Sequence, residues 1–261
     1  IYREQLAALH HGHALWEPDP AGLYDHVTVG DVGYVRQGHF HRLFNILLPA
    51  GDPSHDVLGV PEDFETMRVG AKHLRVLALP KGDYHSLSVT ARDVAVGVQI
   101  ATCSTKQGAV LSLPFDARRE DTFRKRDFRD YLVAHCERWL QFAQGHGLDV
   151  ERMEELILVT GCDRTQPWAL AAFTSTSVSA GISFDLSVLS STVATPSLKW
   201  TVLQREGHSI PYNYGPRPEQ DPRPNQCIFI RGYRAKKRPL QLLPVKILGA
   251  AEPRPDDGEP R

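Results

Sequence analysis

Apolar and polar residues alternate without interruption between positions 177 and 188. The even positions are apolar and the odd positions are Ser, Gly or Asp, so the two sets belong to opposite faces of a β-strand. A polar stretch at 190–196 separates this run from a second alternating run at 197–202. We therefore predict an amphipathic hairpin from Ser177 to Val202. The apolar positions of its first strand are Val178, Ala180, Ile182, Phe184, Leu186 and Val188.

The polar face of this hairpin is made mainly of Ser, Thr and Gly and carries few charges. A strand that crosses the core of a bilayer needs about 9–11 residues, and the twelve residues of 177–188 exceed that length. The same alternation is typical of a half-buried strand in an ordinary antiparallel sheet. The pattern therefore leaves two alternatives open, a hairpin that inserts into membranes and a hairpin of a soluble sheet.

A second candidate hairpin lies earlier in the chain, from Val94 to Leu113, and has small residues as partners of its apolar ones. The segment 86–92 before it alternates in the opposite phase. One extra residue moves the side chains of a strand to the other face, so we expect a bulge or a tight bend at Arg92–Asp93. The apolar positions of this hairpin that could insert are Val94, Val96, Val98 and Ile100.

One long amphipathic helix is predicted at about 121–145, because apolar residues recur there at spacings of three and four. Asp121 is the expected N-cap, and Gly145 or Gly147 is the expected glycine at the C-terminal end. The mostly apolar run Leu156–Thr160 follows and is bounded by a glycine. Such a run predicts a central strand that is covered on both faces.

Shorter strands and turns rich in Gly and Pro fill most of the remaining chain. We expect a strand pair over Val27–Val35 that turns at Gly30–Asp31, and then a strand over His39–Leu48. The sequence shows no internal repeat and no linker. The predicted fold class is α+β, with a predominantly antiparallel β-sheet and one long helix. A single domain at 1–250 would be followed by a disordered polar tail at 251–261.

The composition lies close to the globular average, which excludes a wholly disordered chain, a collagen-like chain and a disulfide scaffold. The 261 residues include 30 Lys and Arg against 31 Asp and Glu, so the formal net charge is −1. A protein that coats nucleic acid needs a dominant basic surface. We therefore expect no nucleic-acid partner.

The four cysteines indicate an intracellular protein. No two of them have CxxC spacing, and so few in a chain of this length are typical of reduced, buried thiols. The segment that begins at Ile1 has no signal-peptide pattern. No apolar run reaches the roughly 18 residues of a transmembrane helix. We therefore expect a cytoplasmic location.

Basic residues gather in two places, although the net charge is close to zero. One cluster stands at the start of the predicted helix, and another follows the strand predicted at 227–233. They could hold anionic lipid headgroups or phosphates, or they could form a solvated face that pairs with nearby acids. The candidates are Arg118, Arg119, Arg124, Lys125, Arg126, Arg234, Lys236 and Lys237, and the acids at the helix start are Glu120, Asp121, Asp127 and Asp130.

Residues that could support catalysis are few. His39 and His41 share one face of a predicted strand and could form a metal site with Asp31, or they could be ordinary surface histidines. Cys162 follows the predicted central strand and could be a nucleophile near Arg164, or a structural thiol. The sequence has no GxSxG motif, no P-loop and no GxGxxG motif, so we expect no cofactor.

The order of the predicted elements resembles that of the gasdermin pore-forming domain. The shared order is a first hairpin, a helix, a strand (here Leu156–Thr160), a second hairpin and a further strand (here Cys227–Tyr233). The resemblance rests on order and character rather than on a motif. It implies a protein that perforates membranes by refolding two hairpins, with several copies joined on the membrane.

Six phrases also resemble a family of uncharacterised proteins from mushroom-forming (basidiomycete) fungi. They are spread over residues 10–240, which implies one continuous domain and a fungal origin but no catalytic residue. The phrases are Gly12 to Pro20 (GHALWEPDP), Gly30 to Tyr34 (GDVGY), Phe40 to Asn45 (FHRLFN), Gly108 to Pro114 (GAVLSLP), Leu158 to Thr165 (LVTGCDRT) and Asn225 to Arg234 (NQCIFIRGYR).

Together these patterns predict a non-enzymatic cytosolic protein that acts at membranes, with an anionic lipid surface and further copies of itself as partners. One alternative is a metal-dependent enzyme built on the His/Asp cluster. Another is a soluble interaction module that uses the Pro-rich loop at 211–224.

Overall fold

A computed structural model of the chain describes residues 1–20, 26–69, 73–95, 98–103, 107–173, 179–187, 197–203, 211–216, 224–237 and 246–249. It confirms the α+β class, because antiparallel strands dominate and are joined by one long helix and one short helix. The polar tail predicted at 251–261 lies outside the described residues.

The described helices and strands follow one another along the chain in this order: α1 (Tyr2–Leu6), η1 (Ala7–Leu9), β1 (His13–Ala14), β2 (Asp31–Arg36), β3 (His39–Asn45), η2 (Pro53–His55), β4 (Leu74–Leu79), β5 (Gly82–His85), β6 (Val89–Ala95), β7 (Val98–Cys103), β8 (Gly108–Leu113), β9 (Ala117–Thr122), α2 (Lys125–Gly145), η4 (Met153–Glu155), β10 (Leu156–Thr165), β11 (Trp168–Phe173), β12 (Ser179–Ser187), β13 (Ser197–Leu203), β14 (Tyr212–Gly215), β15 (Gln226–Lys236) and β16 (Lys246–Gly249).

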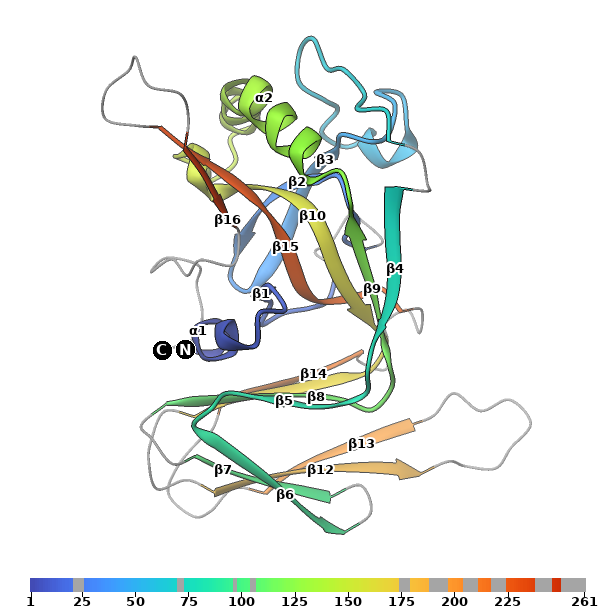
Figure 1. The fold of residues 1–261 in the computed structure, drawn as a ribbon, viewed down its shortest axis with the longest axis vertical. Helices are drawn as coiled ribbons and strands as arrows, with labels where there is room; N and C mark the ends of the chain where they lie inside the picture. The colour runs from blue at the N-terminus through green and yellow to red at the C-terminus, as the bar shows by residue number, and fades with distance from the viewer. Residues whose placement is uncertain are drawn as a thin grey trace, which may run out of the picture.

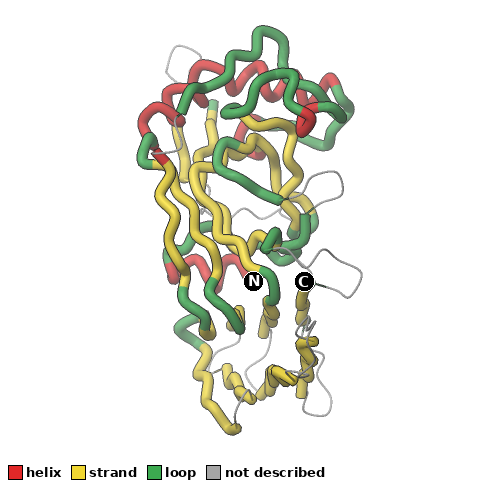
Figure 2. The backbone as a smooth tube through the Cα atoms, turned by 90° about the vertical axis from the view of Figure 1, so that its right-hand side faces the viewer, coloured by secondary structure: helices red, strands yellow, loops and turns green. Residues whose placement is uncertain are grey.

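The described strands form three sheets, which are stacked from top to bottom in Figure 1. The upper sheet contains β1, β2, β3, β4, β9, β10, β15 and β16. The middle sheet has the order β14-β11-β8-β5, and the tip sheet has the order β13-β12-β7-β6. In Figure 2 the strands of the upper sheet run down the molecule, and the two lower sheets are seen nearly end-on.

Two long hairpins run through all three sheets. The first hairpin leaves the upper sheet as β4, β5 and β6 and returns as β7, β8 and β9. The second leaves as β10, β11 and β12 and returns as β13, β14 and β15. Neighbouring arms of the two hairpins pair as β9 with β10, β8 with β11 and β7 with β12. The result is one four-stranded antiparallel ribbon, bent twice along its length.

Strand β10 is the central strand that the sequence predicts. All ten of its residues are buried, and it pairs with β15 along one edge and with β2 and then β9 along the other. The apolar residues from Leu156 to Val159 lie 0–1% exposed. A strand that is covered on both faces needs such a continuous apolar run, which is why the sequence identified it.

Helix α2 packs on the upper sheet through the apolar stripe that the sequence predicts. Its buried residues are Phe128, Leu132, Cys136, Trp139 and Ala143. The ring of Trp139 lies edge-on to Phe44 of β3, with centroids 5.9 Å apart. Burial of each large apolar side chain stabilises the fold by about 1.5–3 kcal/mol. Packing therefore contributes more to this helix than capping, since its N-cap Arg124 makes no capping hydrogen bond through its side chain.

The predicted start of this helix is wrong, because a short strand occupies the residues just before it. Asp121 is not an N-cap, because residues 117–122 form β9 and Asp121 pairs with Gly161 of β10. Sheet pairing on both sides of β9 delays the helix to Lys125. The C-terminal prediction is confirmed, since α2 ends at Gly145 and Gly147 adopts a positive φ of 67°.

The predicted strand pair over Val27–Val35 is also wrong. Only β2 is a strand there, and its partner β3 follows through a turn at Gln37–Gly38. Asp31 does not occupy a hairpin turn, because its carboxylate accepts hydrogen bonds from the backbone N–H of Thr28 and the side chain of Asn45. These bonds hold residues 28–31 in an irregular bend before the strand begins.

The hairpin predicted from Ser177 to Val202 is confirmed by the pairing of β12 with β13, in which Phe184 lies opposite Trp200. The hairpin predicted from Val94 to Leu113 is wrong. The chain reverses between Ala95 and Val98, so the hairpin is β6–β7, with a register irregularity between Asp93 and Ala95 near the predicted bulge. Strand β8 belongs to the middle sheet instead, where it pairs with β5 and β11 and all six of its residues are buried.

The N-terminal segment fills the angle between the upper and middle sheets, where Figure 1 places α1. Tyr2 and Leu6 of α1 are fully buried there, in one apolar cluster with Leu111 of β8, Trp168 of β11 and Phe229 of β15. The first bend of the ribbon therefore has a core of its own, built from both sheets and the start of the chain.

Candidate functional site

The tip sheet brings together the apolar positions that the sequence singles out for insertion. Val94 lies on β6, and Val98 and Ile100 lie on β7. Strand β12 carries the second set, Ala180, Ile182, Phe184 and Leu186. Val96, Val178 and Val188 lie outside the described residues. Figure 1 shows this sheet at the end of the molecule farthest from α2.

The two hairpins meet out of phase in the tip sheet. Within the second hairpin, Ile182 lies opposite Val202 and Leu186 opposite Leu198, so apolar positions coincide. Between the hairpins, Ile182 lies opposite Gln99 on β7, and Ile100 lies opposite Gly181. Positions that are directly opposite each other belong to the same face of a sheet. The apolar positions of β7 therefore lie on one face of the tip sheet and those of β12 on the other. A shift of the register by one residue would bring both sets to the same face.

A proline interrupts each of the four strands of the ribbon at the first bend. Pro80 separates β4 from β5, Pro114 separates β8 from β9, and Pro167 separates β10 from β11. Pro216 follows the end of β14. The registers on both sides of the bend, such as Leu79 with Ala117 and then Gly82 with Leu113, place these interruptions beside one another. We call this row the proline corner.

The proline corner separates two parts of the ribbon with different properties. Proline has no N–H to donate, so it cannot continue an interior ladder of hydrogen bonds. The joints between the middle and tip sheets differ, because three of the four (86–88, 104–107 and 174–178) contain no proline, whereas the fourth (204–211) ends in Pro211. The alignment of these prolines follows from the register of the strands and is not visible in the sequence.

A buried group of charged side chains ties three strands of the ribbon together just above the proline corner. Asp163 on β10 is fully buried, and its Oδ2 accepts a hydrogen bond from Nη2 of Arg119 on β9 at 2.6 Å. Its Oδ1 lies 2.9 Å from Nη1 of Arg231 on β15. Arg231 also donates through Nε to Oδ1 of Asp121 at 2.6 Å. We call these four residues the ion cluster.

Three further charged residues, Arg118, Glu120 and Arg164, form a second group on the opposite face of β9 and β10. Nη2 of Arg164 lies 2.8 Å from Oε1 of Glu120, and Nε of Arg118 donates to the same oxygen at 2.6 Å. Charged groups removed from water stabilise a fold only when each has a partner with good geometry. Arg119, proposed from the sequence as a lipid or phosphate ligand, is therefore committed to Asp163 in this conformation. Arg118, the neighbouring candidate, pairs with Glu120 but is 55% exposed.

The other basic candidates lie on the surface, with one exception. Arg124, Lys125 and Arg126 are exposed at the start of α2, next to Phe123, whose side chain is 63% exposed. Lys236 and Lys237 are also exposed. Arg234 is only 3% exposed, so its side chain does not reach the surface.

Acids pair with several of these exposed cations, as the second alternative from the sequence predicts. Arg124 pairs with Asp127, Arg126 with Asp130 at 3.7 Å, and Lys237 with Glu137 at 3.5 Å. Exposed pairs of this kind contribute only about 0–1 kcal/mol. An anionic surface could therefore compete for these side chains at little cost.

The histidine and aspartate candidates for a metal site do not converge. The rings of His39 and His41 lie 6.1 Å apart on β3, near the turn of the β2–β3 hairpin. Asp31 lies at the other end of that hairpin, opposite Asn45, and its carboxylate is held by Thr28, Asn45 and Arg42. Burial raises the pKa of Asp31. Within the described ranges, no group of three or more His, Cys, Asp or Glu side chains could hold a metal ion.

Cys162 is a structural thiol in this conformation. It is fully buried, and its Sγ points to the carbonyl oxygen of Val27 at 3.5 Å. Burial raises the pKa of Cys162 to about 12, which keeps the sulfur protonated and unreactive at neutral pH.

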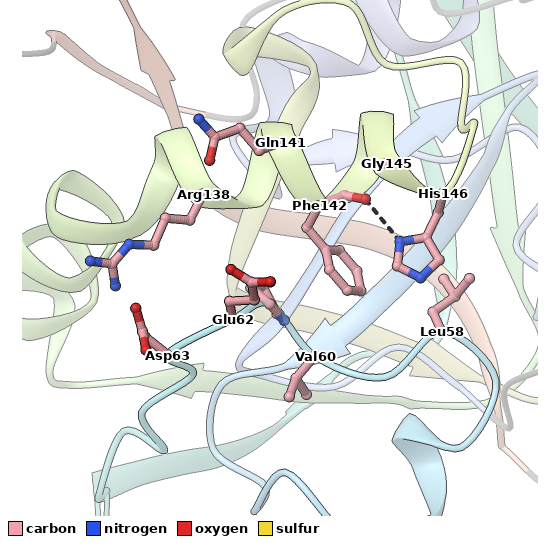
Figure 3. A pocket seen from close by; sticks show the side chains of 10 residues that line it. Leu58, Val60, Glu62, Asp63, Arg138, Gln141, Phe142, Gly145 and His146 are labelled. Atoms are coloured by element: carbon pink, nitrogen blue, oxygen red, sulfur yellow. Dashed lines mark hydrogen bonds between the residues drawn. The ribbon is translucent and has the colours of Figure 1, made fainter.

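A cleft of about 530 Å³ lies between the loop at 58–63 and the C-terminal half of α2 (Figure 3). Glu62 and Asp63 face Arg138 across it, and Nδ1 of His146 is bonded to the carbonyl oxygen of Phe142 at 2.9 Å. The charged lining residues are exposed, so water screens them. No sequence motif in this loop indicates the cleft.

None of the helices in the described ranges is long and apolar enough to span a membrane. Comparisons of the chain with family models, with curated proteins and with solved structures find no match.

Proposed function

We propose that this protein acts at membranes as a gasdermin-like pore former, and that the ends of its two long hairpins insert into the bilayer. The observation that carries the proposal is the ribbon itself. Two hairpins that are far apart in the sequence lie side by side over three sheets, and both end in the tip sheet. An inserting device needs this arrangement, because its strands must move together.

The strands of the ribbon are long enough for this role. β12 alone has nine residues, which meets the lower limit of about 9–11 for a strand that crosses a bilayer core. β11 precedes it with six more residues, and no proline separates the two strands. Removal of the second bend would therefore join the middle and tip sheets into one longer ladder.

The proline corner divides the ribbon into two parts that we expect to behave differently during insertion. Above it, the upper sheet is anchored by α2 and by the ion cluster. Below it, three of the four joints between the middle and tip sheets contain no proline and can become continuous strands. We infer that the upper sheet stays folded and that the part beyond the proline corner changes shape.

The alternation of strand direction supports assembly from several copies. The ribbon has an even number of strands, ordered β4, β9, β10 and β15, and each is antiparallel to the next. A second copy placed with its β15 beside β4 would again be antiparallel, and the sheet would continue once β1 and β16, which pair with the outer edge of β15, have left it. Among the described residues, β4 pairs only with β9, and Arg75 to Ala78 are exposed along it.

The exposed cations at the start of α2 offer a contact for an anionic membrane. Arg124, Lys125 and Arg126 stand beside the exposed ring of Phe123. Each basic residue near an anionic surface contributes about 1 kcal/mol, and an aromatic ring favours the interface between water and lipid. The free thiols of Cys136, Cys162 and Cys227 support a reducing, cytoplasmic location.

The test is release of a trapped dye from vesicles of anionic lipid by the purified full chain. We expect release from anionic vesicles and much less from vesicles of zwitterionic lipid. Ile182→Asp and Phe184→Asp place a charge at apolar positions of β12 and should reduce release at least tenfold. Ser183→Asp, at the polar position between them, is the matched control and should retain most of it.

Thermal unfolding of each variant shows whether the soluble fold is kept. Equal loss of release in Ser183→Asp and Ile182→Asp, with both folded, would contradict the insertion of one face. Absence of release from every lipid mixture, including after either terminus is trimmed, would overturn the proposed function.

A further inference from the structure

At the proline corner, the start of the chain contacts the ribbon through His11, which lies in the middle of the ion cluster. Nη2 of Arg119 donates a hydrogen bond to Nδ1 of His11 at 2.7 Å. Nη1 of Arg231 donates to the carbonyl oxygen of His11 at 2.9 Å. The imidazole ring also contacts the rings of Tyr84 and Phe229, with centroids 5.2 and 5.5 Å away.

The chemistry of this contact fixes the charge of His11. A guanidinium group has only donors, so Nδ1 must be the acceptor and the ring must be neutral. Asp163 is the acid that faces His11, but its oxygens already accept bonds from Arg119 and Arg231. The other polar groups around the ring are the hydroxyl-bearing Tyr84 and the neighbouring His10. A proton on Nδ1 would meet the N–H of Arg119 and add a positive charge between two arginines.

We propose that residues 1–16 form a pH-sensitive clasp, which holds the first bend of the ribbon closed while His11 is neutral and detaches when His11 is protonated. The clasp can leave without breaking the ribbon. Its only strand is the two-residue β1, which pairs with Phe229 and Ile230 at the edge of β15. Its departure would uncover the apolar cluster that Tyr2 and Leu6 share with the upper and middle sheets.

The direction of the pKa shift of His11 agrees with a clasp that docks with a neutral ring. Burial and then the charge of Arg119 lower the pKa of His11 below its ordinary value of 6.5. The docked clasp therefore holds the neutral ring, and the detached clasp takes up the proton. The equilibrium constant for docking of the clasp is therefore highest above about pH 6.5. It falls by up to about tenfold for each unit of pH below that value, until the ring of the docked clasp is protonated as well.

Gly12 supplies an independent means of detaching the clasp. It has a φ of +122°, and a Cβ at this position would lie 2.4 Å from the carbonyl oxygen of Ile230. Gly12→Ala should therefore detach the clasp at every pH. Gly51→Ala is the matched control, since no atom lies within 4 Å of a Cβ there.

The experiment is hydrogen–deuterium exchange of the full chain, followed in peptides that cover residues 1–16, with labelling times scaled for the chemical effect of pH. We expect protection of the wild-type clasp to fall by up to about 30-fold from pH 7.5 to pH 5.0. His11→Asn keeps an acceptor oxygen at the place of Nδ1 and cannot be protonated, so it should stay protected at both values. His146→Asn, at an exposed position on the end of α2, should behave as wild type.

Two results would overturn the clasp. One is equal protection of the wild-type segment at pH 7.5 and 5.0, with Gly12→Ala showing that a detached clasp is detectable. The other is a loss of protection in His11→Asn as large as in wild type. NMR titration of the His11 ring in the unmodified chain tests the clasp without a variant. A pKa of His11 above 6.5 would also contradict the proposal.

The use of the clasp as a gate for insertion rests on the proposed function, whereas its detachment does not. Exchange is measured in solution without lipid, so the two ideas fail separately. If the clasp detaches but no vesicle releases dye, the proposed function falls and the clasp stands.

Discussion

Nη2 of Arg119 lies 2.6 Å from Oδ2 of Asp163, although the two residues are 44 positions apart in the sequence. Asp163 is fully buried and is shared with Arg231, so one carboxylate holds two cations on neighbouring strands. Removal of one member of a buried ion group leaves the others without compensation and costs about 3–5 kcal/mol. We expect Asp163→Asn to lower the free energy of unfolding by about that amount.

Urea denaturation at pH 7.5 measures this loss. Asp127→Asn is the matched control, because Asp127 pairs with Arg124 at the surface and should contribute less than about 1 kcal/mol. Equal stability of the two variants would show that the ion cluster does not hold the ribbon.

Gly232→Ala tests the close approach of β15 to β10. A Cβ at Gly232 would lie 2.3 Å from the carbonyl oxygen of Leu158, which is backbone and cannot move aside as a flexible side chain can. Overpacking of this kind costs about 1–3 kcal/mol. Thermal unfolding should show a clear drop in the midpoint, while Gly51→Ala should remain within about 0.5 kcal/mol of wild type. An unchanged midpoint in Gly232→Ala would mean that the two strands are farther apart than described.

Phe44 and Phe123 provide a matched pair of aromatic truncations. Phe44 is fully buried and contacts Trp139 and Phe142 of α2 with ring centroids 5.9 and 5.5 Å away. Phe44→Ala should cost about 3–5 kcal/mol, and chemical denaturation followed by helical circular dichroism measures it. Phe123→Ala should leave stability almost unchanged and should weaken binding to anionic vesicles in a sedimentation assay. Full vesicle binding by Phe123→Ala would remove this ring from the membrane contact.

The pH dependence of stability should follow three half-buried histidines. Burial is the largest cause that lowers the pKa of His11, His41 and His135 below 6.5. Their neutral forms favour the folded state, so the stability that they contribute is present above pH 6.5 and is lost as the pH falls through the lowered values. Urea midpoints should therefore decrease from pH 7.0 to pH 5.5.

A combined His11→Asn, His41→Asn and His135→Asn variant should show a flatter profile over the same range. The range lies above the ordinary titration of carboxyl groups, so the histidines dominate it. A midpoint that rises as the pH falls in the wild-type chain would contradict the direction of these shifts.

The sequence predicts best those elements whose partners are local or whose pattern is strict. The alternation of 177–188 identified the β12–β13 hairpin, because its two strands are neighbours in the chain. The spacing of apolar residues identified α2, and the apolar run at 156–160 identified the first half of β10. For the hairpin and the helix, the period of the pattern equals the period of the structure, and for β10 the continuous run reflects burial of both faces.

The sequence fails where a strand is defined by a distant partner. Alternation in 94–113 does not reveal that β7 pairs with β12 while β8 pairs with β11 in another sheet. Asp121 has the character of an N-cap, and only its pairing with Gly161 turns it into part of a strand. The ion cluster could not be predicted either, since the partners of Arg119 and Arg231 are chosen by the register of the ribbon.

Within the upper sheet, the two outer strands of the ribbon are not equivalent. In the described residues, β4 offers an uncovered edge, whereas β15 is covered by the two residues of β1 and the four residues of β16. A strand edge that is already paired cannot accept the edge of another copy. If copies join edge to edge as proposed, the very short strands β1 and β16 would have to leave β15 before a neighbour could pair there, so these few residues would decide when association along that edge begins.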